Sequence, residues 1–364
     1  MDFQLTDEQR ALKDGTRELL AGRFGRDRLR AAVEGPVPDR ALWRELGAAG
    51  FFALRLPEED GGVGLGLPEA VLVLEEAGRA LLPGPLVACQ LLAGVVDGVA
   101  TGERIAGLCE GSRDPVLWEH PGGCDELILV EGDGGRCDGH RGVRRNDRTG
   151  GHSDGHRDGR HDGRHDGHRD GPTGGEAEGA RGRTGGAYRS APDRVSCAPF
   201  ASVDPLTPLA RVLDLPRTEP VALDVPRLRR EAALLTAAQQ LGSAVKTVEM
   251  AAGYACEREQ FGAPIGSFQA VKQLCAQMLV RSEIARSAVY AASVTEGVLD
   301  ITGAKLLADE AAVRNARDCL QVHGGMGFTW EADVHLHLKR AWLHAERWGT
   351  VGEAEELLAA GLIA

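Results

Sequence analysis

Apolar residues recur near the helical period at the start of the chain, in the segment DEQRALKDGTRELLAGRF. They are Leu12, Leu19, Leu20 and Phe24. Thr6 stands just before this segment and is followed by two acidic residues, a combination typical of the N-terminal end of a helix. The pattern predicts an amphipathic helix that begins close to residue 7.

Two more helical patterns follow within the first 108 residues. Residues 39–49 place Leu42, Trp43 and Leu46 on one side, and apolar residues recur from Leu67 to about Gly78. Residues 56–66 lie between these patterns and consist of Pro, Gly and acidic residues, which favour turns. We therefore expect an all-helical N-terminal domain over residues 1–108.

The pattern changes between residues 109 and 226. Short runs rich in β-branched residues occur in ELILVEGD, around Val195 and from Val221 to Val225, and they predict strands. Residues 144–176 contain no aliphatic or aromatic side chain, so burial there cannot compensate the entropy lost on ordering. The sequence predicts a small, reduced β middle domain over 109–226, with a disordered Gly/His/Asp/Arg-rich insert at 135–195.

Helical patterns return from Pro226 to the end of the chain. A long apolar face runs from Leu241 to Ala255, a break follows at 261–266, and further helices are expected at 268–295, 303–322 and 334–348. Four helices joined by short connections favour an antiparallel bundle over residues 227–364. The predicted fold class is mainly α, with a reduced β domain between two helical domains.

Histidines cluster in two places and raise the question of a metal site. Those of the insert are His152, His156, His161, His165 and His168. A tract without fixed geometry or supporting contacts favours a solvated segment over a functional metal site, and its composition also resembles a GC-rich gene read in another frame. His335, His337 and His344 follow on the last predicted helix, where spacing favours surface or interface roles over a metal pair. We predict no metal.

Composition excludes several function classes. The formal net charge is −12, which argues against a protein that neutralises nucleic-acid phosphates. Eight cysteines without CxxC spacing indicate reduced thiols rather than a disulfide framework or a zinc site. No apolar run approaches the roughly 20 residues that span a bilayer. These features, with a charged N-terminus that does not resemble a signal peptide, predict a cytoplasmic protein.

The first motif with chemical potential runs from Tyr254 to Gln269, in YACEREQFGAPIGSFQ. Arg258 ends one predicted helix, Phe261 lies in a Gly/Pro turn, and Gln269 begins the next helix. An arginine suits a pyrophosphate, an aromatic ring packs on a flat ring system, and an amide both donates and accepts hydrogen bonds. The alternative is a helical hairpin whose arginine is a solvated cap.

The second motif is QVHGGMGF, which begins at Gln321 about 60 residues later. Gly324 and Gly325 follow a predicted helix, and paired glycines let backbone amides approach a phosphate or ribose closely. A simple glycine C-cap is the alternative. The two motifs together are more specific than either alone.

These motifs resemble those of the acyl-CoA dehydrogenase family, as do LRLPEEDGGVGLG, LEEAGRALLPGPL and the bundle up to KRA at 339–341. The resemblance implies an α domain, a small β domain and a four-helix α domain, assembled as dimers or tetramers with FAD at a subunit interface. It implies acyl-CoA as the substrate and an electron-transferring flavoprotein as the acceptor. The matching FAD contacts from one subunit are Arg258, Phe261 and Gln269, those reaching the neighbouring subunit's FAD are Gln321, Gly324 and Gly325, and Thr350 is a further candidate.

Family chemistry removes the α-proton of an acyl-CoA with a carboxylate while the β-hydrogen leaves as hydride to the flavin. Many members carry this glutamate just before Gly-Thr near the C-terminus, where this chain has Trp348. Others place it at the start of the first bundle helix, where Ala232 aligns and Glu231 is one residue away. Glu231 is therefore the candidate base, and Glu346 lies two residues from the usual site. The alternative is that Glu231 and Glu346 are solvated surface carboxylates.

The middle domain departs from the family as well, because the Tyr-x-Thr-Glu and Trp-x-Asn-Gly-x-Lys segments that cradle the flavin are missing. We therefore predict a subunit of a homo- or hetero-oligomer, either a dimer or an α2β2 tetramer, in which a partner supplies the base or the flavin cradle. Two alternatives stay open. One is a non-catalytic structural homologue, and the other is an enzyme of the same fold with non-dehydrogenase chemistry.

Overall fold

The computed structural model describes residues 5–35, 37–132 and 186–363. Its N-terminal helices are α1 (Asp7–Arg23), α2 (Arg26–Glu34), α3 (Arg40–Ala48), α4 (Leu67–Arg79) and α5 (Leu86–Leu92), with the short 3₁₀ helix η1 (Glu58–Asp60) between α3 and α4. The Thr6 hydroxyl accepts a hydrogen bond from the Gln9 N–H, and the Gln9 side chain accepts one from the Thr6 N–H. This capping box confirms the predicted start of the first helix. Helices α2 and α5 were not predicted.

Two small sheets follow the N-terminal helices. Strands β1 (Ala106–Glu110), β3 (Glu126–Val130), β4 (Ala187–Ser190) and β7 (Glu219–Val221) form a four-stranded sheet in that order. Strands β1 and β3 are parallel, and the other neighbours are antiparallel. Strands β2 (Leu117–Glu119), β6 (Leu209–Asp214) and β5 (Ser196–Phe200) form an antiparallel sheet of three.

The predicted insert is only partly within the described residues. Residues 135–185, including the five histidines of the tract, lie outside them. Disorder is wrong for the end of the segment, because β4 and the 3₁₀ helix η2 (Pro192–Arg194) lie there. Strand β4 pairs with β3 on one side and β7 on the other, so its backbone is satisfied within a sheet.

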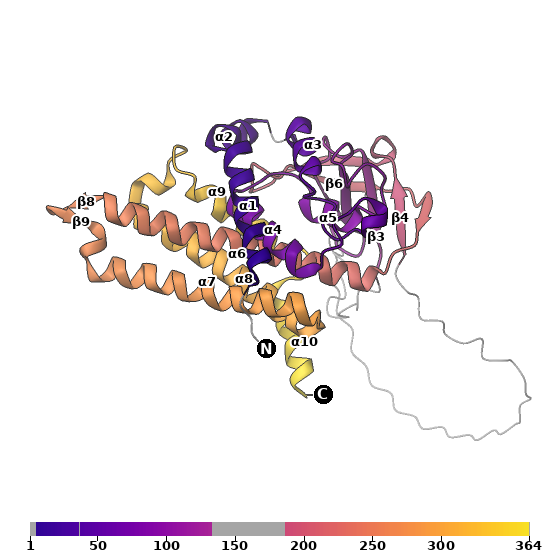
Figure 1. The fold of residues 1–364 in the computed structure, drawn as a ribbon. Helices are drawn as coiled ribbons and strands as arrows, with labels where there is room; N and C mark the ends of the chain where they lie inside the picture. Colours follow the sequence, from indigo (N-terminus) through magenta and orange to yellow (C-terminus); the bar gives the residue numbers. More distant parts are fainter. Residues whose placement is uncertain (1–4, 36, 133–185, 364) are drawn as a thin grey trace, which may run out of the picture. The chain divides into compact units, whose positions relative to one another are not determined.

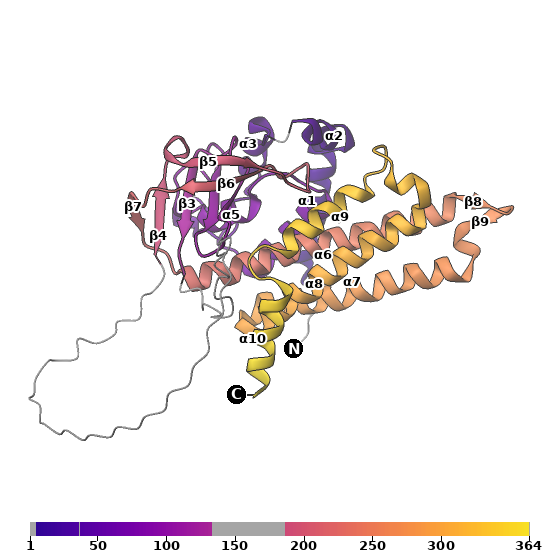
Figure 2. The same ribbon diagram turned by 180° about the vertical axis from the view of Figure 1, so that it is seen from behind.

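The C-terminal part is helical. It contains α6 (Val225–Glu257), α7 (Gln269–Thr295), α8 (Val298–His323), α9 (Val334–Ala345) and α10 (Val351–Ile363), with β8 (Glu259–Gln260), β9 (Ala263–Pro264), η3 (Ile265–Ser267) and η4 (Gly324–Phe328) between them. Helices α6, α7 and α8 lie side by side in both views (Figures 1 and 2), and α9 packs on α6 and α8. The predicted strand around Val225 is wrong at its end, because Asp224 caps α6 and Val225 is its first residue.

Glycine permits a close approach between α4 and α6. A Cβ on Gly78 would lie 2.1 Å from the Gln239 carbonyl oxygen, and one on Gly242 would lie 1.8 Å from the Glu75 carbonyl oxygen. Both contacts are to backbone, which a side-chain rotation cannot relieve. Helix α4 of the N-terminal part and helix α6 of the bundle therefore pack with their backbones in direct contact.

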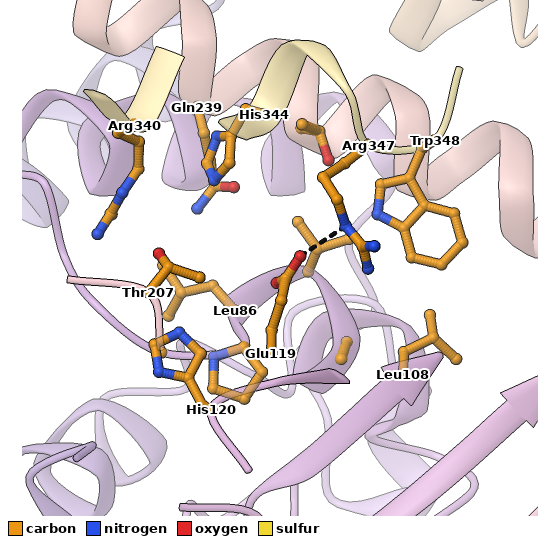
Figure 3. A pocket seen from close by; sticks show the side chains of 15 residues that line it. Leu86, Leu108, Glu119, His120, Thr207, Gln239, Arg340, His344, Arg347 and Trp348 are labelled. Atoms are coloured by element: carbon orange, nitrogen blue, oxygen red, sulfur yellow. Dashed lines mark ion pairs between the residues drawn. The ribbon is translucent and has the colours of Figure 1, made fainter. Parts of the chain in front are cut away.

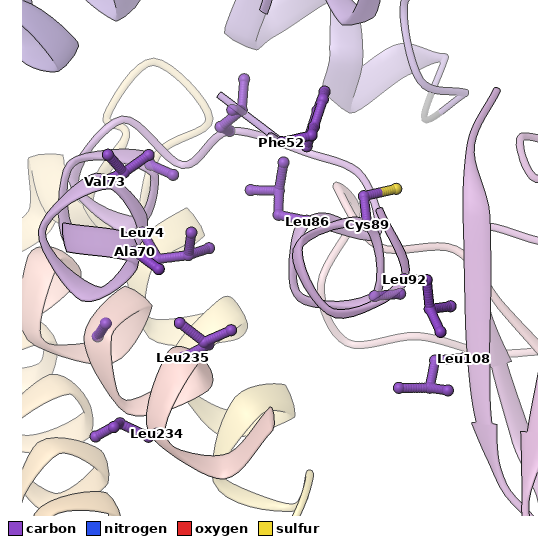
Figure 4. Packing of buried hydrophobic residues seen from close by; sticks show 14 of the residues in the cluster. Phe52, Ala70, Val73, Leu74, Leu86, Cys89, Leu92, Leu108, Leu234 and Leu235 are labelled. Atoms are coloured by element: carbon purple, nitrogen blue, oxygen red, sulfur yellow. The ribbon is translucent and has the colours of Figure 1, made fainter. Parts of the chain in front are cut away.

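One apolar cluster extends from the N-terminal helices through the sheet to the bundle. Figure 4 shows Leu86, Cys89 and Leu92 of α5 between the sheet residue Leu108 and the α6 residues Leu234 and Leu235. The seven described cysteines are all free thiols, and four of them are buried, as expected. Among the described residues, no helix is both long enough and apolar enough to cross a membrane.

Candidate active site

The two sequence motifs meet at one end of the bundle. Arg258 caps the C-terminal end of α6, Phe261 lies in the turn between β8 and β9, and Gln269 is the first residue of α7. Gln321 lies in the last turn of α8, and Gly324 and Gly325 begin η4. All six residues are exposed, and we call them the bundle-end patch.

A small apolar cluster beneath the bundle-end patch holds these segments together. It joins Ala255 of α6, Met278 of α7 and Leu320 of α8. The rings of Tyr254 and His323 stack on each other with centroids 4.2 Å apart, which links the ends of α6 and α8. Because α7 and α8 are antiparallel, the start of α7 and the end of α8 lie at the same end of the bundle.

Phe261 is unusual within the bundle-end patch. Its side chain is 95% exposed, and its backbone has a φ of 54°. A left-handed backbone is uncommon for a bulky residue, and an apolar ring gains nothing from full exposure to water. Phe268 contacts it edge-on, with ring centroids 6.1 Å apart. Strain combined with exposure is a feature of residues that meet a ligand or another chain.

The glycines of the bundle-end patch leave open space beside the backbone. Gly324 has a φ of +59°, and its N–H donates to the Gln321 carbonyl, so it ends α8 as the C-cap alternative expected. A Cβ on Gly324 or Gly325 would meet no heavy atom within 4 Å. Packing within the chain therefore does not explain Gly325, whereas close approach of a ligand to the backbone does.

Thr350 does not join the bundle-end patch. It precedes α10, which packs against α8, and a Cβ on Gly361 of α10 would contact Leu299 near the first turn of α8, so Thr350 lies toward the opposite end. The Thr350 hydroxyl and N–H both engage the Glu353 carboxylate, at 3.1 and 2.8 Å. Arg113 pairs with Glu353 at 2.7 Å. In this structure Thr350 serves as a helix cap.

The position expected for the base lies beside a small polar cavity (Figure 3). Trp348 has a left-handed backbone with a φ of 57° and lines this cavity together with Leu86 of α5 and Leu108 of β1. The cavity encloses about 30 Å³, room for about one or two water molecules and far less than a thioester substrate needs.

An ion pair that the sequence did not reveal lines this cavity. Arg347 Nε lies 2.6 Å from Glu119 Oε1, and the guanidinium carbon of Arg347 stands 5.6 Å from the centre of the Trp348 ring. Arg347 itself is buried. The pair and the indole together form one side of the cavity at the position expected for the base.

A second buried ion pair borders the same cavity. Arg340 Nε donates to Asp204 Oδ2 at 2.7 Å, and the Thr207 hydroxyl donates to the same oxygen at 2.7 Å. Burial opposes ionisation of Asp204, but Arg340 outweighs it, so the pKa of this carboxyl lies below its usual range. Arg340 also donates to the Leu82 carbonyl at 2.9 Å. Helix α9 is thereby attached to the loop before β6 and to the segment after α4.

Glu231, the candidate base, is buried and fully engaged. Its two oxygens accept hydrogen bonds from Arg55 at 2.7 and 2.9 Å, and Arg227 Nε donates at 2.8 Å. Burial opposes ionisation, but the two guanidiniums outweigh it and hold the pKa of Glu231 below its usual range. The expectation of a solvated surface carboxylate is wrong for Glu231, whereas Glu346 is exposed.

One histidine of α9 also differs from expectation. His337 is buried, and its Nδ1 lies 2.8 Å from the Ser243 hydroxyl of α6, so a surface role is wrong for this residue. Burial lowers the pKa of His337 to about 3, which keeps the imidazole neutral. Within the described ranges, no three His, Cys, Asp or Glu side chains are placed to hold a metal ion.

Comparison with known proteins agrees with this architecture. The model of the acyl-CoA dehydrogenase N-terminal domain matches residues 6–103, and that of the C-terminal domain matches residues 228–359. Acyl-CoA dehydrogenase IpdE2 of Mycobacterium tuberculosis is 32% identical over 92% of this chain and 91% of its own length. The chain belongs to the acyl-CoA dehydrogenase family. Its members are FAD-dependent oxidoreductases that act on the CH–CH bond of acyl-CoA.

Other acyl-CoA dehydrogenases extend the comparison. Acyl-CoA dehydrogenase FadE34 of Mycobacterium tuberculosis is 33% identical over 93% of this chain, which spans only 45% of the length of FadE34. Among solved structures, butyryl-CoA dehydrogenase from Megasphaera elsdenii superimposes with a TM-score of 0.73 at 17% identity, with each chain fully covered. The ChsE4–ChsE5 complex of Mycobacterium tuberculosis gives 0.73 at 21%, with 100% of this chain and 99% of that chain covered. These structures show the shared fold.

The bundle-end patch fits the FAD of an acyl-CoA dehydrogenase in the chemistry of its side chains. Arg258 offers a cation for the pyrophosphate, Phe261 an exposed ring, and Gln269 and Gln321 amides. The open space beside Gly324 and Gly325 leaves their backbone accessible. The sequence assigned these residues to two cofactor sites, and the structure brings them together on one surface.

Proposed function

We propose that this chain is one subunit of a heteromeric acyl-CoA dehydrogenase and that a partner subunit supplies the catalytic base. The observation that carries the proposal is the contrast between two places in the structure. The cavity beside Trp348 has a volume of only about 30 Å³, whereas the bundle-end patch is exposed. A chain that cannot admit substrate at its own base position can still complete the cofactor site of another chain.

This contrast indicates which catalytic role belongs to each of the two chains. Bound FAD supplies the hydride acceptor for the β-hydrogen of the acyl-CoA. The partner's carboxylate removes the α-proton, a role that Trp348 cannot perform because an indole has no basic group. This chain contributes binding through Arg258, Phe261 and the Gly324–Gly325 backbone, which hold and orient the dinucleotide at the subunit interface.

Helix α7 supports assembly with another chain. Its side chains Leu279, Val280, Ile284 and Val294 are each at least half exposed. Apolar residues gathered on one helix of a bundle are typical of a surface that another subunit covers. We propose an α2β2 tetramer, because the missing base requires an unlike partner and acyl-CoA dehydrogenases assemble as dimers or tetramers.

Two solved structures of similar fold suggest a class of partner and of substrate. One is the ChsE4–ChsE5 complex, and another is described as the Tcur3481–Tcur3483 steroid acyl-CoA dehydrogenase, with a TM-score of 0.74 at 21% identity. We propose that the partner is a second chain of the same fold that retains its glutamate. A steroid-derived acyl-CoA is the leading substrate class, an electron-transferring flavoprotein the acceptor, and the cytoplasm the location.

The proposal is tested by co-purifying the chain with its partner and counting FAD per chain. We expect one FAD for each partner chain and none for this chain, so that the complex holds half as many flavins as chains. Substituting Arg258→Ala or Phe261→Ala should lower the flavin content without unfolding the chain, because both side chains are exposed. Phe200→Ala, which changes an exposed ring on β5, is the matched control and should leave the flavin content unchanged.

A non-catalytic scaffold is the second candidate, and the closed cavity beside Trp348 favours it. The same flavin count separates the two. In a scaffold, Arg258→Ala and Phe261→Ala leave both the flavin content and the turnover of the complex unchanged. That outcome would exclude the composite site.

A further inference from the structure

A larger cavity lies between the N-terminal helices and the bundle, away from the site described above. It has a volume of about 390 Å³, within the range of small-molecule sites. Helices α1, α2, α4, α6 and α9, all labelled in Figure 1, contribute to its wall. Buried apolar side chains form part of the lining, namely Leu20, Phe24, Leu29 and Leu81. This lining suits the hydrocarbon part of a ligand.

Cations outnumber carboxylates around this cavity. The lining includes Arg17, Arg26, Arg79 and Lys246, but only Glu76 and Asp333 on the acidic side. The two carboxylates are already engaged. Glu76 accepts two hydrogen bonds from Arg17, at 2.8 and 2.9 Å, and Asp333 accepts from Arg26 at 2.9 Å.

Lys246 is the least committed of these cations. Its nearest carboxylate oxygen is Glu249 Oε2, 4.0 Å away, and both oxygens of Glu249 also bind Arg79. The Lys246 side chain is 38% exposed, so its ammonium can move to meet a ligand. An ammonium with weak internal pairing beside an apolar floor favours an anionic group at the mouth of the cavity.

The uncharged wall of the cavity is consistent with a single anionic head group. His337 lines the cavity from α9, and its hydrogen bond to Ser243 fixes the orientation of the ring. Met250 of α6 adds a flexible apolar side chain. Neither His337 nor Met250 adds charge to the wall, so the cations of the lining are the three arginines and Lys246.

We propose that this cavity binds a small amphipathic anion, with its hydrocarbon part on Leu20, Phe24 and Leu81 and its carboxylate or phosphate on Lys246. The site does not depend on flavin or on a partner subunit. A negative result there would leave the proposed function untouched, and failure of the proposed function would leave this site untouched.

Calorimetric titration of the full-length chain tests the proposal with three probes of equal chain length: octanoate, octyl phosphate and octan-1-ol. We expect one saturable site for at least one of the two anions. The alcohol should bind this site with an affinity that is lower by about tenfold or more. The tighter of the two anions identifies the head group. Equal binding of the alcohol and the anions, or no saturable binding of either anion, would overturn the proposal.

Three variants locate the site. Lys246→Met should weaken the anion by about tenfold, and Lys272→Met, an exposed lysine on α7, should not. Ala21→Trp places an indole in the cavity from the surface of α1 and should abolish binding, with the helical circular dichroism unchanged. Anion binding that survives both Lys246→Met and Ala21→Trp would show an adventitious site elsewhere and contradict the assignment.

Discussion

The two oxygens of Glu231 accept hydrogen bonds from Arg55 at 2.7 and 2.9 Å, and Arg227 contacts the same group from α6. A general base needs a free lone pair and a pKa near the working pH. Glu231 is poorly suited to this role, because it is buried and three hydrogen bonds from two guanidiniums engage both its oxygens and hold its pKa below its usual range. We infer that it joins α6 to the segment after α3 and performs no proton transfer.

Glu231→Gln tests that inference through two readouts. Removing one partner of a buried ion pair leaves Arg55 uncompensated, so the free energy of unfolding should fall by about 3 kcal/mol. The pre-formed complex with the partner should keep its turnover within about twofold. If Glu231 were the base, turnover would fall by about 100-fold or more, whatever the change in stability.

His337 makes stability depend on pH. Its pKa is about 3 in the folded chain and about 6.5 in the unfolded chain. Between these values the unfolded chain binds the extra proton, so stability rises with pH across this window and is lost on acidification below about pH 6.5. When the pH falls from 6 to 5, the free energy of unfolding of His337→Gln should decrease by on the order of 1 kcal/mol less than that of the wild type.

Ser243→Ala is the control for this titration in denaturant unfolding at the two pH values. It removes the hydrogen bond at 2.8 Å but retains the histidine. The variant should be less stable at both pH values and keep the pH dependence of the wild type. If the free energy of unfolding of His337→Gln depended on pH as strongly as that of the wild type, another group would be the one that titrates.

The contact between α4 and α6 gives a prediction at the scale of elements. In Gly242→Ala, the new methyl group would lie 1.8 Å from the Glu75 carbonyl oxygen, so the two helices must separate. We expect a loss of about 3 kcal/mol or more, measured by denaturant unfolding. Gly253→Ala is the control on the same helix, where a Cβ meets nothing within 4 Å, and it should stabilise by about 0.5–1 kcal/mol. Equal effects of the two substitutions would contradict the packing.

Helices with a clear apolar period could be predicted from the sequence, and three others could not. Helix α2 has only nine residues and buries only Leu29, so its apolar stripe is short. Helix α5 has seven residues, and α10 begins just after the tight turn at Trp348. Among the strands, β2 has only three residues, too few for alternation to be read.

The bundle-end patch could be predicted in part because its residues lie at helix ends in two local motifs. The residues around Trp348 could not, since their partners are distant in the sequence. Arg340 and Asp204 are 136 positions apart, and Arg347 meets Glu119 of a three-residue strand. Neither pair leaves a local pattern, because the packing of α9 against the sheet region creates both.

In the whole molecule, the helical domains match the family, whereas the region around Trp348 lacks the expected carboxylate. The helical parts follow the acyl-CoA dehydrogenase family, and the bundle-end patch, which we propose binds flavin, is exposed. The position where the sequence resemblance expects the base holds an indole beside a small polar cavity. We propose that a complete active site requires a second chain.

Anaerobic flavin reduction by acyl-CoA tests that claim most directly. The purified chain, supplied with FAD, and its co-purified complex with the partner are each mixed with the substrate, and the bleaching of the flavin absorbance is followed in time. We predict rapid bleaching by the complex and none by the isolated chain. Bleaching by the isolated chain at the rate of the complex would contradict the need for a second chain, because it would require a base within this chain.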